Sequence, residues 1–217
     1  MIKLLLPDGS SRMVENWISG KELIGGLETA LKKEVVCLKV NGELKDLDTQ
    51  LPADAEVSLV RRSDPEALEV LRHSAAHIMA QAVKRIFPAA KLAIGPAIEN
   101  GFYYDFDLPR PLTPEDLTVI EGEMKKIIKE DYPFTHRLVA KEEALASLRQ
   151  AGEKYKEELV AELEDGEISF YQQGEFSDLC RGPHLPSTRY LKAFKLTSIA
   201  GAYWRGDSSR EMLQRIY

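Results

Sequence analysis

Residues 65–87, PEALEVLRHSAAHIMAQAVKRIF, carry the pattern on which the fold of most of this chain depends. Apolar side chains recur there at the spacing of one helix face, and Pro88, which cannot continue a helix, follows directly. The apolar positions are Leu68, Leu71, Ala75, Ile78, Met79, Ala82 and Val83. The same stretch contains His73 and His77, whose i, i+4 spacing places both rings on one side of the predicted helix.

The sequence after this helix alternates between helical and strand-like patterns. Further helices are predicted at about 113–130, 141–150 and 154–163 and from about Ser209. Short strands are predicted at 92–94 and 101–106, around Phe170, at 194–196 and around Tyr203. Residues 69–217 are therefore expected to form an α+β domain in which helices pack on an antiparallel sheet.

The sequence before the helix predicts a smaller unit. Residues 2–6 read as a strand that ends at the turn Pro7-Asp8-Gly9-Ser10, and Asn41-Gly42 is a strong hairpin signal. Ser19 is a candidate N-cap for a helix that runs towards Lys33 and is interrupted at Gly25-Gly26. A β-grasp-like module over 1–62, joined by a polar linker at 63–68, is the expected arrangement.

Composition excludes several classes of protein. The 217 residues carry a net charge of −6, whereas proteins that coat duplex nucleic acid normally carry a basic excess. No apolar run approaches the roughly 20 residues of a membrane helix, and the N-terminus has no signal-peptide pattern. With two cysteines only, a cytoplasmic protein without disulfides is expected. A local pocket for the end of a nucleic acid stays compatible with the charge.

Four residues offer metal-ligand or catalytic chemistry. His73 and His77 form an HxxxH pattern, and Cys180 and His184 form a CxxxH pattern across a Gly-Pro turn. Three imidazoles and one thiolate make a tetrahedral donor set that suits Zn²⁺. The alternative is that these are unrelated core or surface residues.

Three further residues gain interest only in combination with that set. Asp178 precedes Cys180 by two residues, which places both on one face if the segment is a strand. Tyr104 lies in an aromatic strand, and Lys156 lies on a predicted helix. Taken alone, they are explained as a turn acid, a core tyrosine and a solvated lysine.

In this order, the motifs of the chain resemble the N-terminal region of bacterial threonyl-tRNA synthetase. The matching segments are 7–9 (PDG), 41–44 (NGEL), 72–77 (RHSAAH), 93–96 (AIGP), 100–105 (NGFYYD), 178–184 (DLCRGPH) and 201–207 (GAYWRGD). The resemblance implies a TGS domain of β-grasp fold at 1–62, followed by an editing domain at 69–217. Alanyl-tRNA synthetase editing domains share the HxxxH and CxxxH patterns but lack the N-terminal module.

The resemblance implies hydrolytic proofreading. Serine lacks one methyl group of threonine, a difference worth only about 1–3 kcal/mol in a synthetic pocket. A second site that admits serine and excludes threonine would hydrolyse the ester of Ser-tRNA(Thr) and spare Thr-tRNA(Thr). The class II aminoacylation motifs of the family do not occur in the sequence, so we expect no aminoacylation by this chain alone.

The same resemblance assigns roles to residues. His73 and Lys156 are expected to orient the attacking water and the ribose hydroxyl, with Lys156 also stabilising the oxyanion, and Asp178 to bind the substrate ammonium. Cys180 and His184 complete the expected catalytic set. The expected substrate-binding residues are His77 and Tyr104 around the acyl group, and Ala93, Ile94, Gly95 and Pro96 against the terminal adenine.

The implied partner is the aminoacylated 3′ end of tRNA(Thr). Because the threonyl editing domains are thought to work without a metal, no cofactor is expected, and zinc held by His73, His77, Cys180 and His184 is the alternative. The family dimerises through its catalytic core, so this chain is expected to be monomeric. Two other functions compete: an RNA- or partner-binding module with a structural Cys/His cluster, and a zinc-dependent hydrolase, either of the alanyl-editing type or acting on small molecules.

Overall fold

The computed structural model describes residues 1–6, 8–15 and 18–217 and confirms the α+β class. Pro7, part of the predicted first turn, lies outside the described residues. None of the helices within the described ranges is long and apolar enough to cross a membrane.

The N-terminal unit consists of a mixed five-stranded sheet and two short helices. Its strands are β1 (Ile2–Leu5), β2 (Ser11–Val14), β3 (Val35–Val40), β4 (Glu43–Lys45) and β5 (Glu56–Arg61). They lie in the order β2-β1-β5-β3-β4, with β1 and β5 parallel and the other pairs antiparallel. The predicted helix is confirmed as two pieces, α1 (Gly20–Gly25) and α2 (Thr29–Lys32), and Ser19 caps α1 through a capping box with Glu22.

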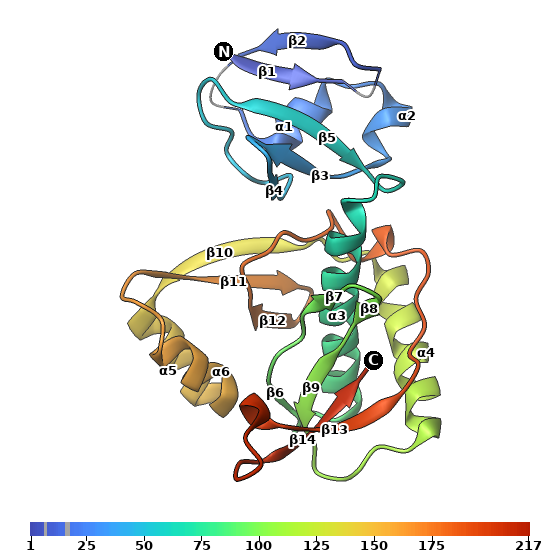
Figure 1. Cartoon of the computed structure of the whole chain (residues 1–217), viewed down its shortest axis with the longest axis vertical. Helices are drawn as coiled ribbons and strands as arrows, with labels where there is room; N and C mark the ends of the chain where they lie inside the picture. Colours follow the sequence, from blue (N-terminus) through green and yellow to red (C-terminus); the bar gives the residue numbers. More distant parts are fainter. Residues whose placement is uncertain (7, 16–17) are drawn as a thin grey trace.

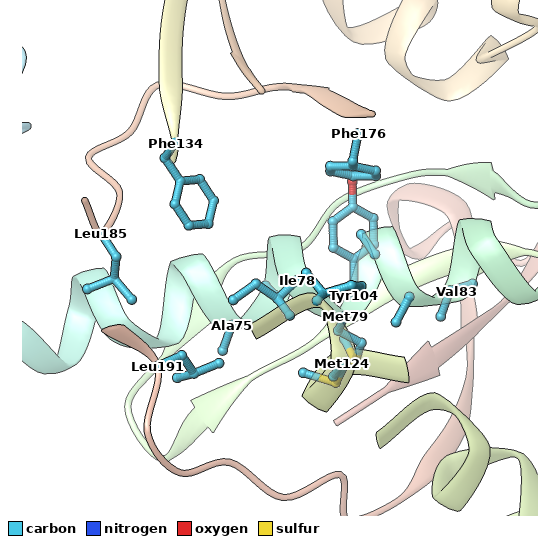
Figure 2. Packing of buried hydrophobic residues seen from close by; sticks show 14 of the residues in the cluster. Ala75, Ile78, Met79, Val83, Tyr104, Met124, Phe134, Phe176, Leu185 and Leu191 are labelled. Atoms are coloured by element: carbon cyan, nitrogen blue, oxygen red, sulfur yellow. The ribbon is translucent and has the colours of Figure 1, made fainter. Parts of the chain in front are cut away.

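Helix α3 (Ala67–Ile86) is the central element of the C-terminal unit, which comprises everything from α3 onward. Figure 1 shows it starting beneath the N-terminal sheet and running through the middle of the second unit. Its apolar face is buried against strands and against α4 (Pro114–Glu130); Figure 2 shows Ala75, Ile78 and Met79 facing this core. Leu68, expected on the buried face, is exposed instead, because Ala67 and Val70 form the core-facing side of this first turn.

The strands around α3 form three antiparallel sheets. The order β13-β14-β9-β6 makes a four-stranded sheet, β10-β11-β12 makes a three-stranded one, and β7 pairs with β8. Their bounds are β6 (Lys91–Leu92), β7 (Ala97–Ile98), β8 (Gly101–Phe102), β9 (Tyr104–Asp107), β10 (Thr135–Ala140), β11 (Glu167–Gln173), β12 (Phe176–Leu179), β13 (Ile199–Tyr203) and β14 (Met212–Ile216). Helices α5 (Lys141–Ala151) and α6 (Lys154–Ala161) pack together beside the three-stranded sheet, and 3-10 turns lie at Thr188–Tyr190 and Trp204–Gly206.

Two predicted elements are wrong. The segment after Ser209 forms strand β14 instead of a helix, because it pairs with β13 on one side and β9 on the other. Residues 194–196 form no strand; Leu196 is buried there, and its N–H donates to the carboxylate of Glu121 at 2.9 Å. A side chain on α4 thus replaces the strand partner that this backbone would need.

Candidate functional site

The two His/Cys motifs converge in space. His73 and His77 project from α3, and Cys180 and His184 lie in the loop after β12. One ligand atom of each residue lies within 4.8 Å of all the others. Cys180 Sγ is 3.1 Å from His73 Nε2 and 3.2 Å from His184 Nε2. The predicted meeting of distant motifs is therefore confirmed.

The loop that carries Cys180 and His184 is held against α3 by local geometry. Gly182 has φ +70, and a Cβ at this position would collide with the Tyr171 ring, so only glycine fits. The Gly182 N–H donates to Cys180 Sγ at 3.2 Å. Ser74, on α3, lies 3.0 Å from His184 Nδ1 and accepts the N–H of Leu185 at 3.0 Å. Ser74 was not predicted as a site residue; its only signal in the sequence is its place between His73 and His77.

A second group of polar residues lies beside the cluster. The carboxylate of Asp178 on β12 pairs with Lys156 Nζ of α6 at 2.8 Å and accepts the hydroxyl of Tyr104 on β9 at 2.5 Å. His77 Nε2 lies 4.0 Å from the same carboxylate. Lys156 is 4% exposed, Asp178 3% and Tyr104 1%. The explanations of Lys156 as a solvated lysine and Asp178 as a solvated acid are therefore wrong.

Burial sets the protonation of the cluster. Desolvation lowers the pKa of His73, and the nearby Lys156 charge acts in the same direction while Asp178 opposes it. Desolvation also lowers the pKa of His77 to about 3 and that of His184 well below its usual range. It raises the pKa of Cys180 to about 12. At neutral pH the site therefore presents neutral imidazoles and a protonated thiol next to one buried ion pair.

These groups open into a cavity of about 1100 Å³. The candidate residues that line it are His73, His77, Ile94, Gly95, Pro96, Tyr104, Lys156, Asp178 and Cys180. Two expected residues are not among the described lining residues. Ala93 is buried in a cluster with Tyr155 and Trp204, because the chain turns it away from the cavity, and His184 lies behind Cys180.

The cluster fits a zinc ion chemically. Three imidazoles and one cysteine are the ligand types of zinc sites, and Nδ1 of His77 is buried without a hydrogen-bond partner within the described chain. If that nitrogen bound a metal, Nε2–H of His77 would face Asp178, which is the carboxylate partner that such histidines usually have. His73, His77, Cys180 and His184 could therefore hold zinc, with Cys180 losing its proton.

Comparison with known proteins identifies relatives of the whole chain. Residues 168–217 match the family described as "Threonyl and Alanyl tRNA synthetase second additional domain". The "Threonine--tRNA ligase" of Clostridioides difficile (strain 630) is 54% identical over 218 residues, and that of Geobacter sp. (strain M21) is 52% identical over 216 residues. Both alignments cover 100% of this chain and 34% of the ligase, so the chain spans about a third of the length of these relatives. The chain is thus similar along its whole length to about a third of these threonine–tRNA ligases, and residues 168–217 match a domain family described for threonyl and alanyl tRNA synthetases.

Proposed function

We propose that this chain is the proofreading part of a threonyl-tRNA synthetase, which hydrolyses the ester of Ser-tRNA(Thr) and spares Thr-tRNA(Thr). In this proposal a TGS domain of β-grasp fold at 1–62 and a linker at 63–68 precede an editing domain at 69–217. The observation that carries the proposal is the shared cavity, where a half-buried His73 faces the buried Lys156–Asp178 pair. The relatives supply the substrate class, because a threonine–tRNA ligase has tRNA(Thr) as its partner.

The walls of the cavity suit a small acyl group. Gly95 packs so closely on the ring of Tyr104 that a Cβ at Gly95 would overlap the ring carbons. Tyr104 is fixed at its other end by the bond to Asp178, so this wall cannot retreat without breaking a buried hydrogen bond. We infer that this wall sterically excludes a threonyl group, which has one methyl more than a seryl group. The segment Ile94–Pro96 continues the wall, and we propose that the terminal adenine binds against it.

Ester hydrolysis needs a proton acceptor and a stabiliser of negative charge. His73, neutral at pH 7, accepts the proton of the water whose oxygen adds to the aminoacyl carbonyl carbon. Lys156 stabilises the resulting oxyanion, and Asp178 also binds the substrate ammonium. Collapse of the intermediate breaks the bond to the ribose oxygen, which takes the proton from His73 and leaves serine and tRNA(Thr). Cys180 is a protonated thiol and therefore shapes the pocket rather than attacking the ester.

A zinc-dependent hydrolase of the alanyl-editing type is the second candidate, and the four-ligand cluster favours it. A zinc ion there would supply an activated water. The Lys156 ammonium favours the metal-free proposal, because it already pairs at 2.8 Å with Asp178, the buried carboxylate that would otherwise attract a second cation. We further propose that the chain acts in the cytoplasm, and that the full-length protein is a homodimer.

Deacylation of Ser-tRNA(Thr) and Thr-tRNA(Thr) by the purified chain tests these proposals. We expect turnover of the seryl ester only, unaffected by a chelator, and losses of about 10²–10⁴-fold for His73→Ala and about 10²–10³-fold for Lys156→Ala. Stoichiometric zinc with activity lost to chelation would replace the metal-free mechanism. Binding of Ser-tRNA(Thr) without hydrolysis would identify a binding module, and hydrolysis of simple esters without RNA would identify a small-molecule hydrolase.

A further inference from the structure

One residue of the N-terminal unit makes direct contact with the loop that carries the candidate site. Asp46 follows β4 and lies 138 positions before His184 in the sequence. Its Oδ1 accepts the backbone N–H of His184 at 2.7 Å, and its Oδ2 accepts the hydroxyl of Tyr171 on β11. A carboxylate from the first unit therefore ties together two segments of the second.

The contacts of Asp46 are continuous with those that fix the His184 imidazole. The Tyr171 ring lies 4.6 Å from the His184 ring, and Phe134 stacks on the same imidazole at 4.8 Å. The ring nitrogens of His184 meet Ser74 and Cys180. The imidazole is thus fixed through its ring by the second unit and through its backbone by the first.

The Asp46 carboxylate makes these contacts in a partly buried position. Burial raises the pKa of Asp46, and the bonds from Tyr171 and His184 oppose that change. Asp48, two residues later, is exposed and pairs with Lys21 on the surface of the same unit. Because a partly buried carboxylate needs hydrogen bonds to replace lost hydration, the loop position in which Asp46 makes both bonds is favoured.

We propose that Asp46 is a positioning residue of the candidate site, and that the N-terminal unit is thereby a structural part of that site. Asp46 sets the backbone of His184, His184 contacts Cys180, and Cys180 contacts His73, which faces the cavity. Because neither Asp46 nor His184 is among the residues that line the cavity in the described chain, Asp46 acts on the rate of the chemical step and not on tRNA binding.

Replacements of Asp46 distinguish the effect of where the acceptor oxygen lies from the effect of the carboxylate charge. Asp46→Asn keeps an oxygen for the His184 N–H and offers an amide donor to the Tyr171 oxygen, so it retains most activity. Asp46→Glu keeps the charge but displaces the carboxylate by one methylene, and Asp46→Ala removes the acceptor. We expect both to lower kcat of seryl-ester hydrolysis by about 10–100-fold with KM little changed. Asp48→Asn is the matched control and should behave as the wild type.

The activity readout rests on the proposed function, so a second readout is needed that does not. Hydrogen exchange of the His184 amide, followed by NMR in the intact chain, should accelerate in Asp46→Ala and Asp46→Glu and stay slow in Asp46→Asn and Asp48→Asn. A wild-type chain that fails to hydrolyse Ser-tRNA(Thr) would sink the proposed function but leave this measurement intact. Unchanged kcat and unchanged His184 exchange in folded Asp46→Glu would overturn the positioning role, and Asp46→Glu decides the matter if Asp46→Ala does not fold.

Discussion

Lys156 combines a buried ammonium with two neighbours that fix it. Its Nζ lies 2.8 Å from Asp178 and 5.4 Å from the centre of the Tyr104 ring, so the cation is held by an ion pair and by a ring face. The same charge lies close enough to His73 to lower the pKa of that imidazole. Lys156 therefore influences both the negative charge that develops in the reaction and the group that takes the proton.

Replacing Lys156 should change the titration of His73. In Lys156→Met the cation that opposes protonation is gone and Asp178, which favours it, is left without its partner, so the pKa of His73 should rise. NMR titration of the His73 ring measures this without any substrate. Lys154→Met is the control, because Lys154 is half exposed and pairs with Asp107 and Glu211. An unmoved His73 titration would show that Lys156 does not act on the imidazole.

The buried histidines predict a dependence of stability on pH. The pKa values of His77 and His184 are lowered in the folded chain, so below about pH 6.5 the unfolded chain takes up protons that the folded chain refuses. The free energy of unfolding should therefore decline as the pH falls, by about 1 kcal/mol for each histidine between about pH 7 and 5.5. Urea unfolding at the two pH values measures the difference. His77→Asn should make it about 1 kcal/mol smaller; an equal difference would mean that His77 is not buried in its neutral form.

At the scale of elements, the segment between β6 and β7 is shaped by one close contact. It passes over Tyr104 at Gly95, where a side chain would overlap the ring. This contact joins the segment proposed to bind the adenine to the tyrosine that binds Asp178. The segment and β9 therefore form one wall rather than two independent ones.

Gly95→Ala should damage that wall. The added methyl forces Tyr104 or the segment to shift, which weakens the bond to Asp178 and lowers the free energy of unfolding by about 1–3 kcal/mol. Deacylation and denaturant unfolding are the two measurements, and both should decline. Gly122→Ala is the matched control: Gly122 lies inside α4 with open space around it, and alanine there should stabilise by about 0.5–1 kcal/mol. Full activity in Gly95→Ala would show that the wall adapts.

How far the sequence predicted these elements depended on whether their signals are local. Helix α4 was predicted from Thr113 and Pro114, whose cap and first-turn chemistry the structure shows, and α3 ended before Pro88 as expected. Strand β14 was predicted as a helix because Met212, Leu213 and Ile216 also fit helical spacing, and only its pairing with distant strands decides between the two. Strands β10 and β12 were not predicted either; β10 pairs with β11 across two intervening helices, whereas β12 forms a tight hairpin with β11.

The candidate site divides in the same way. The two His/Cys motifs are visible as spacings, so their convergence could be predicted. The burial of Lys156 and Asp178 could not, because it depends on α6 and β12 meeting across the cavity wall. Asp46 has no local signal at all: its partners lie in another unit, and an aspartate after a hairpin is ordinarily a surface residue.

At the scale of the whole molecule, β3 serves two hydrophobic cores. Val35, Leu38 and Val40 belong to the core inside the N-terminal unit, whereas Val36 and Cys37 belong to the core that contains α3. The register of β3 against β5 shifts between Val35 and Cys37, which lets two successive side chains face α3. The two units are thus joined by a continuous apolar core as well as by Asp46.

Valine-to-alanine changes at adjacent positions should separate these two cores. Val35 and Val36 are both fully buried. Truncating either one to alanine should lower the free energy of unfolding by about 2 kcal/mol. Because Val36 packs in the core shared with α3, Val36→Ala should accelerate hydrogen exchange in the N-terminal sheet and in α3 together. Val35→Ala, which opens only the inner core, should accelerate exchange in the sheet and leave α3 protected. Hydrogen exchange, measured peptide by peptide in both variants, compares two truncations of equal size in the same strand. If both variants left α3 equally protected, the shared core would not couple the units, and the bond between Asp46 and His184 would then have to position the candidate site without support from the core beneath it.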